Sequence, residues 1–146
     1  MNPHDFIAKY RAGAEECERD TGVPALISLA QAALESGWGN KAAGNNFFGI
    51  KADGSWKGKA VIVRTHEYEH GKRVCRNLSF RAYATAAESF ADHGKFLRDN
   101  PRYAPCFACG DNASRWCDAL QTCGYATDPS YSRTLRMVLD SVRSRL

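Results

Sequence analysis

The chain lacks any apolar run close to the roughly 20 residues that a membrane-spanning helix needs. Its first five residues also lack the basic and apolar segments of a secretory signal. We therefore expect no membrane insertion. Export would need another route, such as release from a larger secreted protein, a dedicated machine or phage lysis, and the sequence does not choose among them.

Internal repeats, low-complexity segments and linkers rich in Pro, Gly or Ser are absent as well. A chain of 146 residues with 44% hydrophobic and 25% charged residues has the composition of a folded globular domain. We expect residues 1–146 to form a single domain and to be monomeric.

Negative charge is slightly outnumbered, and the chain has a net charge of +4. Part of it lies near the C-terminus, at Arg133, Arg136, Arg143 and Arg145. An anionic partner would fit this charge, but no nucleic-acid-binding motif accompanies it, so we expect no nucleic-acid partner. A solvated helix face is the preferred explanation of these arginines.

Helical periodicity dominates what is present. Thr85 and Glu88 have the spacing of a capping box, and the helix that they open is expected to bury Ala86, Ala87, Phe90, Ala91 and Leu97. The expected helices are about Pro3 to Arg19, Ala25 to Ser36, Thr85 to Asn100, Asn112 to Gly124, and a last one opening at Asp128-Pro129.

Two segments with strand character, Ala60 to Glu69 and Lys72 to Tyr83, flank the two-residue turn His70-Gly71. This turn sets a register that pairs Val61 with Phe80, Val63 with Leu78, Thr65 with Arg76 and Glu67 with Val74. The predicted fold class is α+β, mostly helical with a small β-hairpin lobe.

The helix expected from Ala25 to Ser36 is apolar around most of its circumference. Ser28, Gln31 and Glu35 follow one another at helical spacing, and we expect this edge to line a cleft. Burial and the negative end of the helix dipole would both raise the pKa of Glu35. A carboxyl group of this kind can protonate the leaving oxygen of a glycoside, although a solvated glutamate at a helix end is an equally good reading of the pattern alone.

Several sequence blocks occur together in a fixed order. Ala30-Gln-Ala-Ala-Leu-Glu-Ser-Gly-Trp-Gly39 is followed by Asn46-Phe-Phe-Gly-Ile-Lys51, Thr65-His-Glu-Tyr-Glu69, Phe80-Arg-Ala-Tyr83, Asn100-Pro-Arg-Tyr103 and Gly124-Tyr-Ala-Thr-Asp-Pro129. From about residue 20 onward the chain closely resembles the glucosaminidase domains of glycoside hydrolase family 73, which include those of the flagellar rod-cap peptidoglycan hydrolases.

The resemblance implies a lysozyme-like α+β fold with a substrate groove between the helical body and the hairpin. It places the catalytic acid at Glu35, a second catalytic carboxylate at Glu67, and an active-site tyrosine at Tyr125. Glu69 is the alternative for the second carboxylate because it shares a strand face with Glu67. If Glu67 is not catalytic, its expected role is a cross-strand ion pair with Arg76. If Tyr125 is not catalytic, its expected role is packing in the core behind a C-cap glycine.

We expect no cofactor and no metal in the catalytic site. The resemblance implies hydrolysis of β-1,4 bonds in the peptidoglycan backbone, as an endo-β-N-acetylglucosaminidase acting in the periplasm or extracellular cell wall. The alternatives are a muramidase, a lytic transglycosylase and an inactive glycan-binding module. Phe47 and Trp56 are further candidates for apolar sugar platforms. The substrate-binding candidates are Gln31, Trp38, Asn46, Phe48, Tyr68 and Glu69.

Six cysteines lie outside these blocks. Disulfides are the first expectation in an oxidising compartment. Small core thiols at Cys117 and Cys123 are the second, and a zinc site that uses Cys106 and Cys109 followed by Cys117 and Cys123 is the third. The cysteines are Cys17, Cys75, Cys106, Cys109, Cys117 and Cys123.

Overall fold

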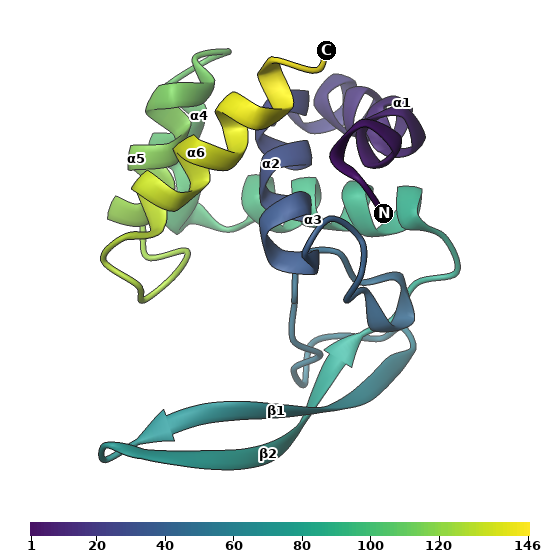
Figure 1. The fold of residues 1–146 in the computed structure, drawn as a ribbon, viewed down its shortest axis with the longest axis vertical. Coiled ribbons are helices and arrows are strands. Elements are labelled where there is room, and N and C mark those ends of the chain that lie inside the picture. The colour runs from purple at the N-terminus through teal and green to yellow at the C-terminus, as the bar shows by residue number, and fades with distance from the viewer.

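The computed structural model describes the backbone of residues 1–146 and every side chain except those of Glu67 and Tyr68. A helical body carries a long β-hairpin that extends away from it (Figure 1). The α-helices are α1 (Pro3–Thr21), α2 (Ala25–Ser36), α3 (Ala86–Asp99), α4 (Ala104–Phe107), α5 (Ala113–Thr122) and α6 (Tyr131–Arg143). The 3-10 helices are η1 (Ala43–Asn45) and η2 (Pro101–Tyr103), and the strands are β1 (Ala60–Glu69) and β2 (Lys72–Arg81).

The α+β class is confirmed, and capping side chains begin the helices where the sequence predicts them. The Asn2 side chain accepts a hydrogen bond from the Asp5 amide at the start of α1. Thr85 accepts from the Glu88 amide at the start of α3, and Asn112 accepts from the Arg115 amide at the start of α5. These bonds pair backbone N–H groups that have no partner within the helix.

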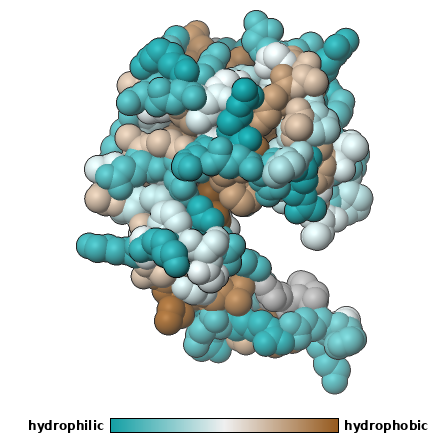
Figure 2. All heavy atoms as spheres, turned by 180° about the vertical axis from the view of Figure 1, so that it is seen from behind, coloured by the Kyte–Doolittle hydropathy of each residue, from teal (hydrophilic) through white to brown (hydrophobic). Residues whose placement is uncertain are grey.

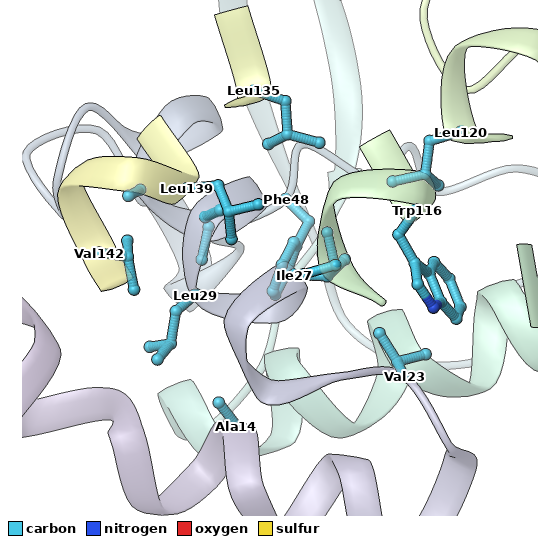
Figure 3. Packing of buried hydrophobic residues seen from close by; sticks show 14 of the residues in the cluster. Ala14, Val23, Ile27, Leu29, Phe48, Trp116, Leu120, Leu135, Leu139 and Val142 are labelled. Carbon is cyan, nitrogen blue, oxygen red and sulfur yellow. The ribbon is translucent and has the colours of Figure 1, made fainter. Parts of the chain in front are cut away.

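Helix α2 passes through the centre of the body, with α1, α5 and α6 packed around it (Figure 3). Its side chains Ile27 and Leu29 are almost completely buried, as are Leu135 and Leu139 of α6. Burial of each such side chain contributes roughly 1.5–3 kcal/mol to stability. The all-round apolar sequence of α2 follows from this central position.

The hairpin has the predicted turn and register. Val61 pairs with Phe80, Val63 with Leu78 and Thr65 with Arg76. His70 and Gly71 have φ values of 51° and 77°, so both turn residues adopt the left-handed conformation of a tight hairpin turn. Strand β2 ends at Arg81, two residues before the expected Tyr83.

The base of the hairpin is tied to the body by the loop that follows α2. The Asn46 side chain donates to the carbonyl oxygens of Ile50 and Arg81, at 2.9 Å and 3.0 Å. Gly44 is needed here because its φ is 63° and a Cβ atom would lie 2.9 Å from that of Ala82. These contacts hold the hairpin base directly beside the end of α2.

The inward face of α3 differs from the prediction. Ala87 and Ala91 are exposed, whereas His93 and Gly94 are buried. Helices α1 and α3 approach each other so closely at Gly94 that a Cβ atom there would lie 2.3 Å from the Cys17 sulfur. This close approach sets the rotation of α3 and brings His93 into the core.

The six cysteines all belong to the described part of the chain, and they are free thiols, so the expectation of disulfides is not supported. Cys17, Cys106 and Cys117 are buried, so the expectation of core thiols holds for Cys117, whereas Cys123 is only partly buried. The Cys106 and Cys123 sulfurs are 4.0 Å apart. Among the described residues, no three His, Cys, Asp or Glu side chains converge as metal ligands would.

Within the described chain, none of the helices combines the length and apolar character that a membrane span requires.

Candidate active site

Glu35 occupies the last turn of α2, immediately before the left-handed Gly37 that ends the helix. The residue as a whole is solvent-exposed, but its side chain lines a cleft whose walls partly desolvate the carboxyl group. This partial desolvation raises the pKa of Glu35 above the usual range of a glutamate. The site therefore favours the protonated carboxyl group that general-acid catalysis needs.

The carboxyl group lies in a cleft with a volume of about 500 Å³. The space-filling view shows an open hollow between the helical body and the hairpin arm (Figure 2). The cleft walls come from the end of α2, the loop after it, the end of β2, α3, η2 and the segment after α5. Its lining residues are Glu35, Phe48, Gly49, Ile50, Lys51, Asp53, Arg81, Phe96, Tyr103, Tyr125, Ala126 and Thr127.

Three tyrosines lie together on the wall of the cleft or directly behind it. The ring centroid of Tyr125 is 6.0 Å from that of Tyr103 and 5.7 Å from that of Tyr131. Burial raises the pKa of Tyr125, and the Glu35 charge adds to this increase. All three hydroxyls therefore stay protonated at neutral pH and can donate hydrogen bonds.

The cleft continues in two directions. Asp53, Arg81 and Phe96 are shared with a second hollow of about 520 Å³ that extends past Trp56 to Pro101. In the other direction, Gly49 is shared with a hollow of about 270 Å³ under the hairpin, lined by Asn46, Val63, Thr65 and Phe80 among others. Glu35 thus lies within a groove that is longer than the hollow around its own carboxyl group.

The predicted site residues separate into two groups. Glu35, Phe48 and Tyr125 line the same cleft. Gln31 does not reach it: the side chain is completely buried, and its amide donates to the Tyr131 hydroxyl at 2.9 Å. The expectation that the whole Ser28, Gln31 and Glu35 edge lines the cleft is therefore wrong, and only Glu35 does.

Three other candidates have structural contacts of their own. Both polar atoms of the Asn46 side chain bind backbone groups of its own loop and of β2. Trp38 is half-buried with its ring edge-on to Phe6 in the body. Phe48 is 3% exposed and stacks on His93, with ring centroids 3.8 Å apart. Phe48 is thus mainly a packing residue of the cleft wall, and Asn46 fixes the loop.

Glu67 and Tyr68 lie outside the described side chains, so their proposed roles stay predictions. The Glu69 carboxylate accepts two hydrogen bonds from the Arg76 guanidinium, and the one from Arg76 Nε has a donor–acceptor distance of 2.7 Å. Arg76 lowers the pKa of Glu69, which keeps this carboxylate ionised. Lys72 is the residue directly opposite Glu69 on β2, yet the Glu69 carboxylate pairs with Arg76, four positions further along that strand.

Comparison with known proteins identifies the family to which the chain belongs. Residues 11–144 match the profile of the glucosaminidase family, described as mannosyl-glycoprotein endo-beta-N-acetylglucosaminidase. The chain belongs to this glucosaminidase family. The resemblance inferred from the ordered sequence blocks is thereby confirmed.

Individual relatives of the chain agree with this assignment. The chain is 42% identical to the peptidoglycan hydrolase FlgJ of Vibrio cholerae over 135 residues, which cover 88% of this chain and 40% of that protein. It is 42% identical to the exo-glucosaminidase LytG of Bacillus subtilis over 122 residues, covering 78% of this chain and 42% of that protein. The chain thus spans less than half the length of these relatives.

A solved structure matches this chain over almost its whole length. The C-terminally truncated glycoside hydrolase domain of Salmonella typhimurium FlgJ superimposes with a TM-score of 0.83 at 37% identity, over 98% of this chain and 99% of that one. The lysozyme-like arrangement of a helical body and a hairpin lobe is therefore confirmed.

Several residues that line the cleft, or lie directly behind its wall, were missed by sequence reasoning. Arg81 and Tyr103 belong to ordered sequence blocks that had been recognised, so those blocks held a usable signal. His93 and Tyr131 carry no such signal, because they occupy core-facing helix positions where a polar group is unexpected. Their roles depend on neighbours that are distant in the sequence.

Proposed function

We propose that this glucosaminidase-family chain hydrolyses the β-1,4 bond that follows N-acetylglucosamine in the peptidoglycan backbone. The observation that carries the proposal is Glu35, a carboxyl group with a raised pKa inside a long groove. The curated relatives FlgJ and LytG are named as a peptidoglycan hydrolase and an exo-glucosaminidase. Family membership, groove shape and acid chemistry agree.

Glu35 acts as the general acid. Hydrolysis requires a proton on the glycosidic oxygen as the bond to the anomeric carbon breaks. An ordinary glutamate is almost fully ionised at neutral pH, whereas the desolvated Glu35 keeps a larger protonated fraction. The proton from Glu35 completes the new hydroxyl group of the departing sugar, and water supplies the hydroxyl group at the anomeric carbon.

The second carboxylate is assigned to Glu67, which orients or activates the attacking water. Support for this choice over Glu69 comes from Arg76, which holds the Glu69 carboxylate by two hydrogen bonds. A carboxylate engaged in this way is a poorer base because its ionised form is stabilised. In this reaction Tyr125 donates its hydroxyl hydrogen to the substrate or to the water.

An endo mode of attack fits the groove. The hollow around Glu35 is continued both towards Trp56 and under the hairpin, so sugars can bind on either side of the cleaved bond. The name of LytG indicates exo cleavage in that relative, and the size of the released products distinguishes the two modes.

Peptidoglycan is the proposed partner, and the cell wall, in the periplasm or outside the cell, is the proposed place of action. We expect the domain to act as a monomer, since Glu35, Tyr125 and the groove walls all come from one chain. The greater length of the relatives fits a domain that works within a larger secreted protein.

Digestion of purified cell walls, followed by borohydride reduction and mass spectrometry, tests the proposal. Reduced N-acetylglucosamine at the new chain ends is the expected product. Reduced N-acetylmuramic acid would show a muramidase, and an anhydro sugar would show a lytic transglycosylase. Glu35→Gln is the matched control, and release of no fragment by the unaltered protein would indicate a glycan-binding module instead.

A further inference from the structure

His93 lies directly behind Tyr125. It projects from α3 into the core and is completely buried. Its Nε2 atom is 3.2 Å from the Tyr125 hydroxyl oxygen. One face of its imidazole ring stacks on Phe48, with ring planes 8° apart. Packing therefore fixes both the position and the orientation of this ring.

The histidine is neutral in this environment. Burial lowers the pKa of His93 to about 3, so one of its ring nitrogens carries a hydrogen and the other carries a lone pair. The hydrogen bond to Tyr125 can consequently run in either direction, depending on which tautomer is present.

The other ring nitrogen decides between the tautomers. Nδ1 of His93 is buried and has no hydrogen-bond partner among the described residues. A buried N–H group without an acceptor is rarer in proteins than a buried acceptor without a donor. The favoured tautomer therefore has a bare Nδ1 and a hydrogen on Nε2.

We propose that His93 is a positioning residue that donates the Nε2–H hydrogen bond to the Tyr125 oxygen and thereby directs the Tyr125 hydroxyl hydrogen into the cleft. The phenol oxygen accepts from behind, and its own hydrogen points towards the Glu35 side, where a carbonyl or water oxygen of the bound substrate accepts it. Tyr125 is thus held as a donor before the substrate arrives. This inference rests on the proposed function of Tyr125.

The surroundings of Tyr125 support this direction. Its backbone amide donates to the Leu120 carbonyl at 3.0 Å, which fixes the segment after α5. The Tyr103 and Tyr131 rings flank its own ring. Because neighbouring rings hold the Tyr125 ring in place, rotation of its hydroxyl group about the C–O bond is the main motion that remains. The hydrogen bond from His93 restricts this rotation.

Nitrogen-15 NMR of the unaltered protein tests the tautomer without any need for activity. The expected spectrum shows a protonated Nε2 and an unprotonated Nδ1 for His93. A hydrogen on Nδ1 would overturn the proposal. Because this measurement needs no substrate, it decides the inference even if the protein cleaves no glycan, an outcome that would contradict the proposed function instead.

A double-mutant cycle tests the consequence for catalysis. His93→Phe keeps the stack on Phe48 but removes the donor, and it should lower kcat on a soluble peptidoglycan oligosaccharide about threefold to tenfold, the range for one neutral hydrogen bond. KM should change less, because the bond acts in the transition state. In a Tyr125→Phe background the same substitution should have almost no further effect on kcat. Equal losses in both backgrounds would show that His93 acts only through packing.

Two further variants separate the hydrogen bond from stability. His93→Gln places an amide N–H near the Nε2 position and should recover part of the kcat lost in His93→Phe. His4→Phe, on the exposed surface of α1, is the matched control and should leave kcat unchanged. If His93→Phe does not fold, His93→Gln and the tautomer measurement still decide the proposal, and a kcat for His93→Gln as low as that for Tyr125→Phe would contradict it.

Discussion

At the scale of single residues, Glu35 owes its raised pKa to its place in the fold. The side chain follows two turns of buried apolar helix and ends in a partly enclosed cleft, where desolvation disfavours its charge. The folded-state pKa lies above the unfolded-state value. The contribution of Glu35 to stability is therefore full at acid pH and is lost as the pH rises through its folded pKa.

Glu35→Gln should separate activity from stability. The substitution keeps the shape and removes the proton donor, so turnover should fall by at least about 100-fold. At neutral pH the melting temperature should stay equal or rise, because no charge remains to be desolvated. Cell-wall hydrolysis and thermal unfolding, both followed against pH, check this.

In the unaltered enzyme the same group should set the alkaline limb of the pH profile. Activity is expected to decline as Glu35 ionises, at a pH above the usual range of a glutamate. A glutamine variant that clears cell walls at nearly the original rate would remove Glu35 from the mechanism.

At the scale of elements, the hairpin and α3 differ in how well local pattern determines them. The register of β1 and β2 follows from the two-residue turn and the alternation of side chains. The buried face of α3 depends on which neighbours pack against it. The Gly94 contact with α1 rotates the helix, so His93 rather than Ala91 faces inward.

The hairpin carries the test of the second carboxylate. Glu67→Gln should lower turnover much more than Glu69→Gln at saturating substrate, because the Glu69 carboxylate is already bound by Arg76. Glu69→Gln loses a surface ion pair, so its effect on stability should be small. Turnover and thermal unfolding of both variants are the measurements. A greater loss of turnover at position 69 would move the second carboxylate there.

At the scale of the whole molecule, the active site depends on how the hairpin lobe joins the helical body. Arg81, at the end of β2, donates to the Asp92 carboxylate of α3 at 3.0 Å, and the Tyr83 hydroxyl donates to the same oxygen. The Arg81 and Asp92 side chains are only 12% and 19% exposed. Because Arg81 also lines the groove, this junction joins the two lobes at the substrate site.

Asp92→Asn should weaken this junction. It keeps the shape but leaves the largely buried Arg81 cation without its charged partner, so the free energy of unfolding should fall by about 1–3 kcal/mol. Turnover should fall with it, since Arg81 would no longer be fixed in the groove. Urea unfolding and hydrolysis assays measure both effects.

Asp99→Asn on the same helix is the matched control for stability. Asp99 forms an ion pair with Lys95, and both side chains are more than half exposed, so the unfolding midpoint should hardly change. Equal destabilisation by the two variants would contradict a special role for the Arg81 and Asp92 pair.

The sequence by itself determined the features that depend on residues a few positions apart. Asn2, Thr85 and Asn112 mark helix starts, and the turn at His70 sets the hairpin register, because capping and turn formation are local. The run of apolar residues before Glu35 also predicts a buried helix that ends beside it, although the family resemblance, and not this pattern alone, placed the catalytic acid there.

Only the tertiary structure decided which polar groups reach the cleft and which are held behind it. Gln31 and Glu35 share a helix edge, yet Gln31 bonds to Tyr131, a hundred residues away. The pairs of His93 with Tyr125 and of Arg81 with Asp92 likewise join different elements. Helix and strand periodicity define a face, but burial and pairing on that face depend on elements distant in the chain, whose approach is set by packing of the whole core.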